Sequence, residues 1–404
     1  MFERLKNLRG DYPSQFWLIF LGNLISTIGM SMIWPFMVVY ASEKLGLPLT
    51  AVAGLMTINS AMSLVASFVA GSLTDRIGRR IVMIVGMTLH GIVYFSFIFA
   101  DSLSSFIILM AVSGFISPIY RVGVDAMVAD LIPSEKRVDA YALLRMGNNV
   151  GVSLGPTIGG FLAAVSYSIT FGCASAGLLL YGLLTFLFTK ETLPARTEAA
   201  PRERFGGYGK VIKDRVFISV TSAFTISTIG SSMVFVLLSV YTKGQFGIPE
   251  NQFGFIMAAN AGMVVLFQVL VTRISKRFNP YNVMTIGALF YALGVGSMAL
   301  GNSFWDFMIS IIIMTLGEML LVPTTSTLVA NLAPPDMRGR YMSLYGLTWG
   351  IASGIGPLLG GFLNDNIAPV AIWYGGGLIG LVSVVILAVL AARHQETAPL
   401  SGTL

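Results

Sequence analysis

Long apolar stretches alternate with short polar segments throughout the chain of 404 residues. A helix needs about 20 apolar residues to cross a bilayer, and twelve stretches approach or exceed that length between charged residues, Gly, Pro, Asn and Asp. The predicted spans are residues 15–40, 51–72, 81–100, 104–130, 138–166, 168–189, 216–241, 252–273, 281–300, 305–331, 341–364 and 370–392. The pattern therefore predicts an all-α membrane protein with twelve transmembrane helices.

The composition supports this interpretation. Hydrophobic residues make up 55% of the chain and charged residues only 11%, with a mean hydropathy of +0.79, whereas about a quarter of the residues in a soluble globular protein are charged. The 44 glycines suit helices that pack closely in lipid. One cysteine, Cys173, and two histidines exclude a disulfide framework and an ordinary zinc site. We therefore expect no metal and no cofactor.

The net charge of +6 is explained by where the basic residues fall. Of the 25 Lys and Arg residues, all but four lie in the termini and in the loops that follow even-numbered spans. The four exceptions are Lys44 and Lys243, in loops that follow odd-numbered spans, and Arg121 and Arg145, within spans. Basic residues concentrate on the cytoplasmic side of membrane proteins. This predicts a multi-pass protein of the inner (plasma) membrane with both termini cytoplasmic, with contact to inner-leaflet lipid as a secondary effect and no nucleic-acid partner.

The chain contains an internal repeat. Residues 26–29 (Ser-Thr-Ile-Gly) recur 201 positions later as residues 227–230, and the same offset carries the Gly-Pro-x-x-Gly-Gly-Phe-Leu string of residues 155–162 onto residues 356–363. The prediction is two pseudo-symmetric six-helix bundles, residues 1–189 and 216–404, joined by a cytoplasmic linker, residues 190–215. Two such parallel halves can rock about a central site. A duplicated scaffold without transport is the alternative.

A motif lies between the second and third spans: Gly71-Ser-Leu73-Thr-Asp75-Arg76-Ile-Gly78-Arg79-Arg80. It resembles the signature loop of the major facilitator superfamily, which implies the major facilitator fold and a loop that latches the cytoplasmic side when the transporter opens outward. Two glycines let a short loop turn sharply. The alternative is that the arginines only enforce topology.

The repeat inverts the sign of two charges near this loop, because Asp75 maps onto Lys276 and Asp139 onto Arg340. We therefore expect pseudo-symmetric gating contacts between the halves, each contributing about 0–1 kcal/mol. The expected pairs are Asp75 with Arg338 or Arg340, and Lys276 with Glu135 or Asp139.

The fifth span carries a glycine-rich string that resembles the motif of the drug:proton antiporter branch of the superfamily. It consists of Gly151, Gly155, Pro156, Gly159 and Gly160. The resemblance implies export in exchange for protons. Glycines spaced four apart also form a flat helix face, so ordinary small-residue packing is the alternative.

Four charged residues lie within the predicted spans, where each costs about 2.5–3.5 kcal/mol on insertion scales. Arg121 and Asp125 are one turn apart, so they can neutralise each other, and Arg145 can compete for the same carboxylate. Glu318 has no basic residue within a turn and suits a proton carrier. These four are the predicted proton-coupling residues, with a static salt bridge and a permanently protonated Glu318 as alternatives. Asp130 is interpreted as an interfacial cap.

In the superfamily the first, fourth, seventh and tenth spans line the passage, although residues 109–115 lack the arginine and Gln-Gly pair that the family often carries there. The predicted cavity residues are Asn23, Ser26, Trp34, Tyr120, Asn148, Met233 and Trp349. The resemblance implies a monomeric, proton-driven exporter of small lipophilic compounds, with substrate, protons and membrane lipid as its partners and no enzymatic activity. Export of a sugar, lipid or metabolite, and a non-transporting sensor or scaffold, remain alternatives.

Overall fold

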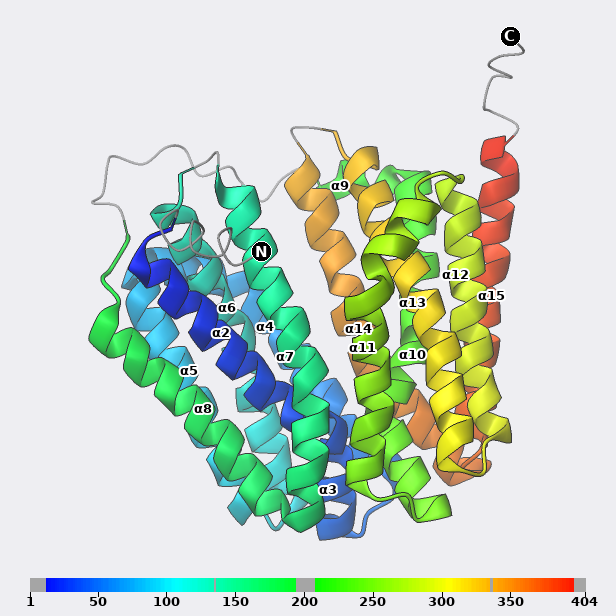
Figure 1. The fold of residues 1–404 in the computed structure, drawn as a ribbon, viewed down its shortest axis with the longest axis horizontal. Coiled ribbons are helices and arrows are strands. Elements are labelled where there is room, and N and C mark those ends of the chain that lie inside the picture. The colour runs from blue at the N-terminus through cyan, green and yellow to red at the C-terminus, as the bar shows by residue number, and fades with distance from the viewer. Residues whose placement is uncertain (1–11, 134–135, 194–207, 335–336, 396–404) are drawn as a thin grey trace. The chain divides into compact units, whose positions relative to one another are not determined.

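The computed structural model describes residues 12–133, 136–193, 208–334 and 337–395, and Figure 1 shows that helices form nearly all of this part of the chain. The long helices are α2 (Ser14–Ile33, continued by η1, Trp34–Phe36, and α3, Met37–Leu45), α4 (Leu49–Ile77), α5 (Arg79–Ser96), α6 (Leu103–Leu131), α7 (Arg137–Val165), α8 (Tyr167–Phe188), α10 (Arg215–Phe246), α11 (Glu250–Ser275), α12 (Pro280–Ser297), α13 (Phe304–Leu332), α14 (Arg338–Asn366) and α15 (Ala371–Gln395). The predicted all-α class is confirmed.

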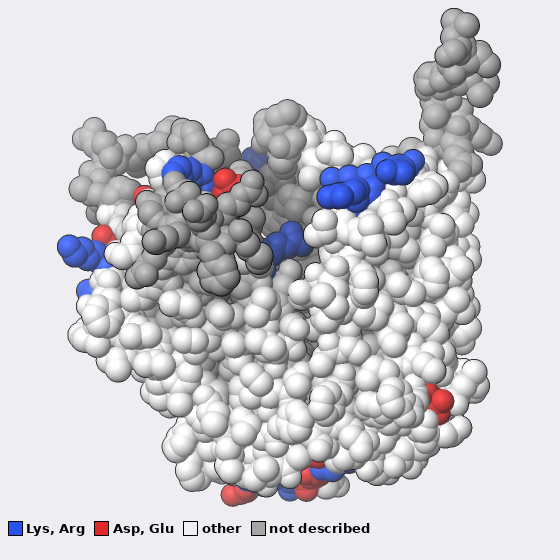
Figure 2. Space-filling model, viewed as in Figure 1, with Lys and Arg blue, Asp and Glu red and all other residues white. Residues whose placement is uncertain are grey.

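The helices follow the predicted spans in order. In the described part of the chain, eleven of them are both long and apolar enough to cross a membrane. The other predicted span corresponds to α7, whose 29 residues exceed the length that a bilayer requires. On the face shown in Figure 2, charged atoms gather towards the two ends and leave a broad uncharged band between them. The predicted linker contains a short helix, α9 (Tyr208–Lys213), while residues 194–207 lie outside the described part.

The chain divides into two compact units that largely follow the two repeats. Unit 1 contains residues 1–46, 58–200 and 249–261, and unit 2 contains residues 47–57, 201–248 and 262–404. Within unit 1, α2 packs on α7 and α5 packs on α8. Within unit 2, the repeat-equivalent pairs α10–α14 and α12–α15 pack in the same way. The two-bundle architecture is therefore present in the helix pairing as well as in the sequence.

The N-terminal turns of α4 belong to unit 2 and those of α11 belong to unit 1, so each helix begins in the unit of the other repeat. A carboxylate forms hydrogen bonds at each of these helix starts. In unit 2, Asp365 accepts hydrogen bonds from the backbone N–H groups of Leu49 and Thr50, at 3.1 and 2.7 Å. A carboxylate at this position stabilises a helix N-terminus, where backbone N–H groups lack partners. In unit 1, the hydroxyl of Tyr167 donates to Oε1 of Glu250 at 2.6 Å.

Candidate functional site

The loop between α4 and α5 is shorter than the sequence predicts. The second span was expected to end at residue 72, but α4 continues to Ile77 and α5 begins at Arg79. Gly78 alone makes the turn, with a φ of 103° that residues with a side chain rarely adopt. The prediction that Gly71 takes part in the turn is wrong, because it lies inside α4, where the helix continues into the polar residues Asp75 and Arg76.

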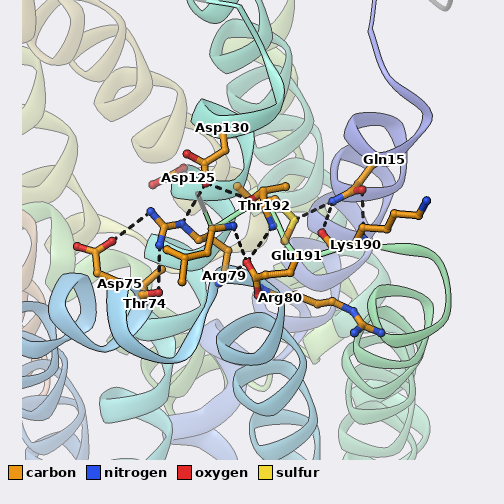
Figure 3. A network of polar contacts seen from close by, with 12 residues as sticks. Gln15, Thr74, Asp75, Arg79, Arg80, Asp125, Asp130, Lys190, Glu191 and Thr192 are labelled. Carbon is orange, nitrogen blue, oxygen red and sulfur yellow. Dashed lines mark hydrogen bonds and ion pairs between the residues drawn. The ribbon is translucent and has the colours of Figure 1, made fainter. Parts of the chain in front are cut away.

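Glu191, just beyond α8, caps the start of α5. Because Gly78 has no side chain, it cannot cap that helix itself. The carboxylate of Glu191 accepts the backbone N–H groups of Arg79 and Arg80 at 3.0 and 3.1 Å, as Figure 3 shows, and also those of Thr192 and Leu193 at 2.9 and 3.0 Å. One side chain thus satisfies donors on two segments.

Arg79 joins this capped turn to two more helix ends. Its guanidinium is 3.1 Å from Asp75 of α4 and 3.1 Å from Asp130 of α6, and it donates to the backbone oxygen of Thr74 at 3.3 Å. Asp130 also accepts the hydroxyl of Thr192 at 3.1 Å. The interpretation of Asp130 as an interfacial cap is wrong, because its carboxylate points to these donors. The alternative that Arg79 serves only topology does not fit a buried, paired guanidinium.

Gln15, in the first turn of α2, fixes the chain just before Glu191. Its amide donates to the backbone oxygen of Lys190 at 2.9 Å and accepts the backbone N–H of Lys190 at 3.2 Å (Figure 3). We call the connected set the loop clasp: Gln15, Asp75, Arg79, Asp130, Lys190, Glu191 and Thr192. It ties the ends of α2, α4, α5 and α6 to the segment that follows α8 within unit 1.

The Glu191 carboxylate is stabilised in its ionised form. Desolvation raises the pKa of Glu191, but its four backbone N–H partners outweigh that effect and hold the pKa below the usual range. A pKa that is depressed in the folded state contributes stability above the unfolded-state value of about 4.3. That contribution is lost as the pH falls through the folded-state pKa.

Glu191→Ala is expected to destabilise unit 1 by about 1 kcal/mol at pH 7, the typical effect of losing a helix cap. The measurement is the thermal midpoint of the purified protein in detergent. Glu191→Gln keeps an acceptor but no longer titrates, so wild type should lose stability relative to Glu191→Gln between pH 6 and about pH 3. A difference between these two proteins that does not change with pH would contradict the role of the ionised cap.

Apart from Gly78 and Arg80, whose turn Glu191 caps, the other predicted gating residues do not belong to the clasp. Arg76, Asp139 and Lys276 are exposed. Arg80 donates to the backbone oxygen of Phe186 at 2.6 Å and lies over its ring. Glu135 and the side chain of Arg338 lie outside the described residues. The pairings between halves, including that of Arg340, therefore stay predictions.

A cavity of about 450 Å³ opens between α2, α6 and α7 of unit 1. Six predicted residues line it, three as cavity residues and three as proton-coupling residues. They are Asn23, Tyr120, Asn148, Arg121, Asp125 and Arg145. Thr27 and Tyr141 also line it, although the sequence pattern did not single them out.

Hydrogen bonds fix the polar wall of this cavity. Oδ1 of Asn148 accepts the amide of Asn23 and the hydroxyl of Thr27, both at 2.8 Å, so it joins α7 to α2. The hydroxyl of Tyr141 donates to the backbone oxygen of Asp125 at 2.7 Å, which joins α7 to α6. The three helices that line the cavity are therefore tied together around it.

Two guanidinium groups and one carboxylate share this cavity. Arg121, Asp125 and Arg145 are all exposed to it, and among the described residues no ion pair within 4.0 Å joins any two of them. The static salt bridge that the sequence allowed is thus absent from this structure. The three side chains give the cavity a formal charge of +1, whereas all four charged residues of the spans sum to zero.

The remaining predicted residues lie elsewhere. Ser26 and Met233 are fully buried, and Ser26 donates to the backbone oxygen of Asn23, so the prediction that they line a cavity is wrong for this structure. Trp34 lies in η1, and the ring of Trp349 packs against Phe224 at 5.6 Å between centroids. Glu318, on α13 of unit 2, is half-buried and interacts electrostatically with the buried Tyr291 of α12.

The glycines of the α7 string form a tightly packed face. A Cβ on Gly151 would lie 2.8 Å from Cβ of Thr27, and a Cβ on Gly155 or Gly159 would overlap Ser31 or the backbone of Met32. The repeat copy behaves alike, because a Cβ on Gly356 would overlap the Ser232 side chain on α10. This face packs α7 against α2. Because both helices line the cavity, the glycine face positions the site, whether or not it also has a role in antiport.

These features define a multi-pass membrane protein built from two repeated helical bundles, one of which encloses a charged cavity. Residues 19–243 and 220–403 match the Major Facilitator Superfamily. The chain belongs to this superfamily of membrane transporters.

Relatives and solved structures agree with this assignment. The chain is 25% identical to the uncharacterised transporter YhjO of Bacillus subtilis, over 93% of this chain and 92% of the relative. It is 25% identical to the Na(+), Li(+), K(+)/H(+) antiporter of Planococcus maritimus over 88% and 89%, and 23% identical to the quinolone resistance protein NorA of Staphylococcus aureus over 95% and 98%. A peptide transporter POT structure with bound sulfate superposes with a TM-score of 0.77 at 18% identity, covering 94% and 95%.

Proposed function

We propose that this transporter exports small lipophilic compounds in exchange for protons, by alternating access. The observation that carries the proposal is the unit 1 cavity, in which the carboxyl of Asp125 and two guanidiniums face a space large enough for a small molecule. Charged side chains in membrane spans are costly and are typical of ion and substrate pathways. A cation/proton antiporter and a quinolone resistance protein among the relatives also support it.

Protonation supplies the coupling in this proposal. A protonated Asp125 no longer attracts Arg121 and Arg145, so protonation loosens the cluster that the three side chains form. Glu318 carries a proton in unit 2, where neutralising its charge lowers the cost of burying it. Either change shifts the balance between outward-open and inward-open forms, so that protons enter as substrate leaves.

The test is solute movement driven by a pH gradient. The purified full chain is reconstituted into liposomes with an acidic lumen, and uptake of a fluorescent lipophilic dye and of a quinolone carboxylic acid is followed. We expect uptake several-fold above that of protein-free liposomes, with alkalinisation of the lumen, and loss of both signals when an ionophore collapses the gradient. Movement of neither probe under either sign of gradient would favour a non-transporting sensor or scaffold.

Monovalent cation exchange is the second candidate, because one relative carries that activity in its name. The positive formal charge of the cavity disfavours a bare cation. In the same liposomes, proton release on addition of NaCl, without dye uptake, would favour this second candidate over export of organic compounds.

A further inference from the structure

The second repeat lacks the loop clasp of the first. The positions 201 residues after Arg79 and Asp130 hold Pro280 and Asn331, so the ion pair between α5 and α6 has no counterpart between α12 and α13. The start of α12 does not need a carboxylate from elsewhere either, because Oδ1 of Asn279 accepts the backbone N–H of Tyr281 at 2.9 Å. Within the described residues, no ion pair therefore joins α12 to α13 at the place where Arg79 and Asp130 pair in unit 1.

A hollow of about 210 Å³ occupies that place in unit 2. It is bounded by α11, α12 and α13, and both Pro280 and Asn331 line it. Thr272, Thr327 and Lys276 also line it and add polar groups to a wall that contains Phe278, Pro323 and Leu328 as well. Where the buried guanidinium of Arg79 bridges two helices in unit 1, the second repeat thus leaves an open space with a partly polar wall, which we call the polar hollow.

A second, apolar hollow of about 400 Å³ adjoins the first. Val271, Ile274, Ile286 and Leu320 line it. The two hollows share Ser275 and Phe278, on and just beyond the end of α11. A hollow with a partly polar wall and an almost wholly apolar hollow therefore meet across two side chains, which is an arrangement that suits an amphiphilic molecule.

The charge of the polar hollow favours an anion. Lys276 is exposed, and within the described residues its ammonium group has no hydrogen bond or ion pair. Among the described residues, no Asp or Glu lines either hollow. Arg273 and Arg277 flank the position in the sequence and are also exposed, so basic side chains dominate this end of α11.

We propose that the paired hollows bind an anionic phospholipid, with the phosphate at Lys276 and part of an acyl chain in the apolar hollow. A free phosphate could satisfy Lys276 but would leave the apolar hollow unfilled. Basic clusters at the membrane surface attract anionic headgroups, and acyl burial adds affinity with each methylene. The site lies in unit 2, outside the unit 1 cavity, and does not depend on which compound is exported.

Native mass spectrometry of the full chain in detergent tests this, with phosphatidylglycerol compared against phosphatidylcholine of the same acyl chains. We expect the first lipid bound by wild type to be phosphatidylglycerol, by about fivefold, the contribution of one basic side chain near an anionic surface. Lys276→Gln should remove the preference. Lys213→Gln, an exposed lysine of α9 that removes the same charge, should keep it. Equal binding of the two lipids by wild type would overturn the proposal.

The apolar hollow is tested separately. Ile286→Trp fills it and should weaken binding of both lipids several-fold, whereas Ile309→Trp, at a similarly exposed position on α13, should not. Inorganic phosphate and glycerol phosphate identify the source of the anion. If either displaces phosphatidylglycerol at equal concentration, and Ile286→Trp binds phosphatidylglycerol as wild type does, the occupant is a soluble anion and the lipid assignment fails.

Discussion

Glu318→Gln is expected to reduce pH-driven export at least tenfold while leaving the protein folded. Glutamine preserves the size and hydrogen-bonding capacity of the side chain but cannot carry a proton, so binding of a proton in unit 2 is removed without a cavity or a buried charge. The half-buried position of Glu318 beside Tyr291 suits such a group. The measurement is dye uptake into acidic-lumen liposomes, with thermal midpoints recorded for each variant.

Asp306→Asn serves as the matched control. It makes the same chemical change on the same helix, but Asp306 caps the start of α13 and accepts its bonds from Asn302 and Ser303, so uptake should remain near that of wild type. Full uptake by Glu318→Gln would remove Glu318 as the proton carrier. Asp125→Asn then tests whether the unit 1 cavity carries the proton. If this variant loses proton-coupled uptake, the proposed exchange stands and Asp125, not Glu318, is the proton carrier.

The helices could be predicted because lipid imposes a simple rule on sequence, a run of apolar residues between polar ends. Part of the cavity could be predicted for a similar reason, because Asn23, Arg121 and Arg145 are polar residues inside apolar runs. The direction in which each side chain of a helix points could not be predicted, because successive residues are rotated by about 100° around the helix axis and the sequence does not show which face meets the cavity. Ser26 and Met233 were therefore assigned to a cavity although both are buried.

The loop clasp shows a different limit. Gly78 indicates from sequence alone that α5 needs a cap from elsewhere. Nothing in the sequence pattern connects that need to Glu191, because the bond from the Arg79 N–H spans 112 residues and the bond from Gln15 to Lys190 spans 175. Such partners follow from how α5 and α8 pack within unit 1, and that packing is fixed by small residues and shape rather than by a local motif.

Gly159→Ala should destabilise unit 1 by about 1–3 kcal/mol and lower transport with it, although alanine is the better helix former. The added Cβ would overlap backbone atoms of Met32, which cannot move aside as a flexible side chain can. Gly172→Ala, on α8, is the matched control, because a Cβ there meets nothing within 4 Å; it should be neutral or stabilising by up to about 1 kcal/mol. Thermal midpoints in detergent and uptake into liposomes measure both variants. If the two substitutions shift the midpoint in the same direction, the glycine face does not hold α7 against α2, and the string has to act on transport by some other means.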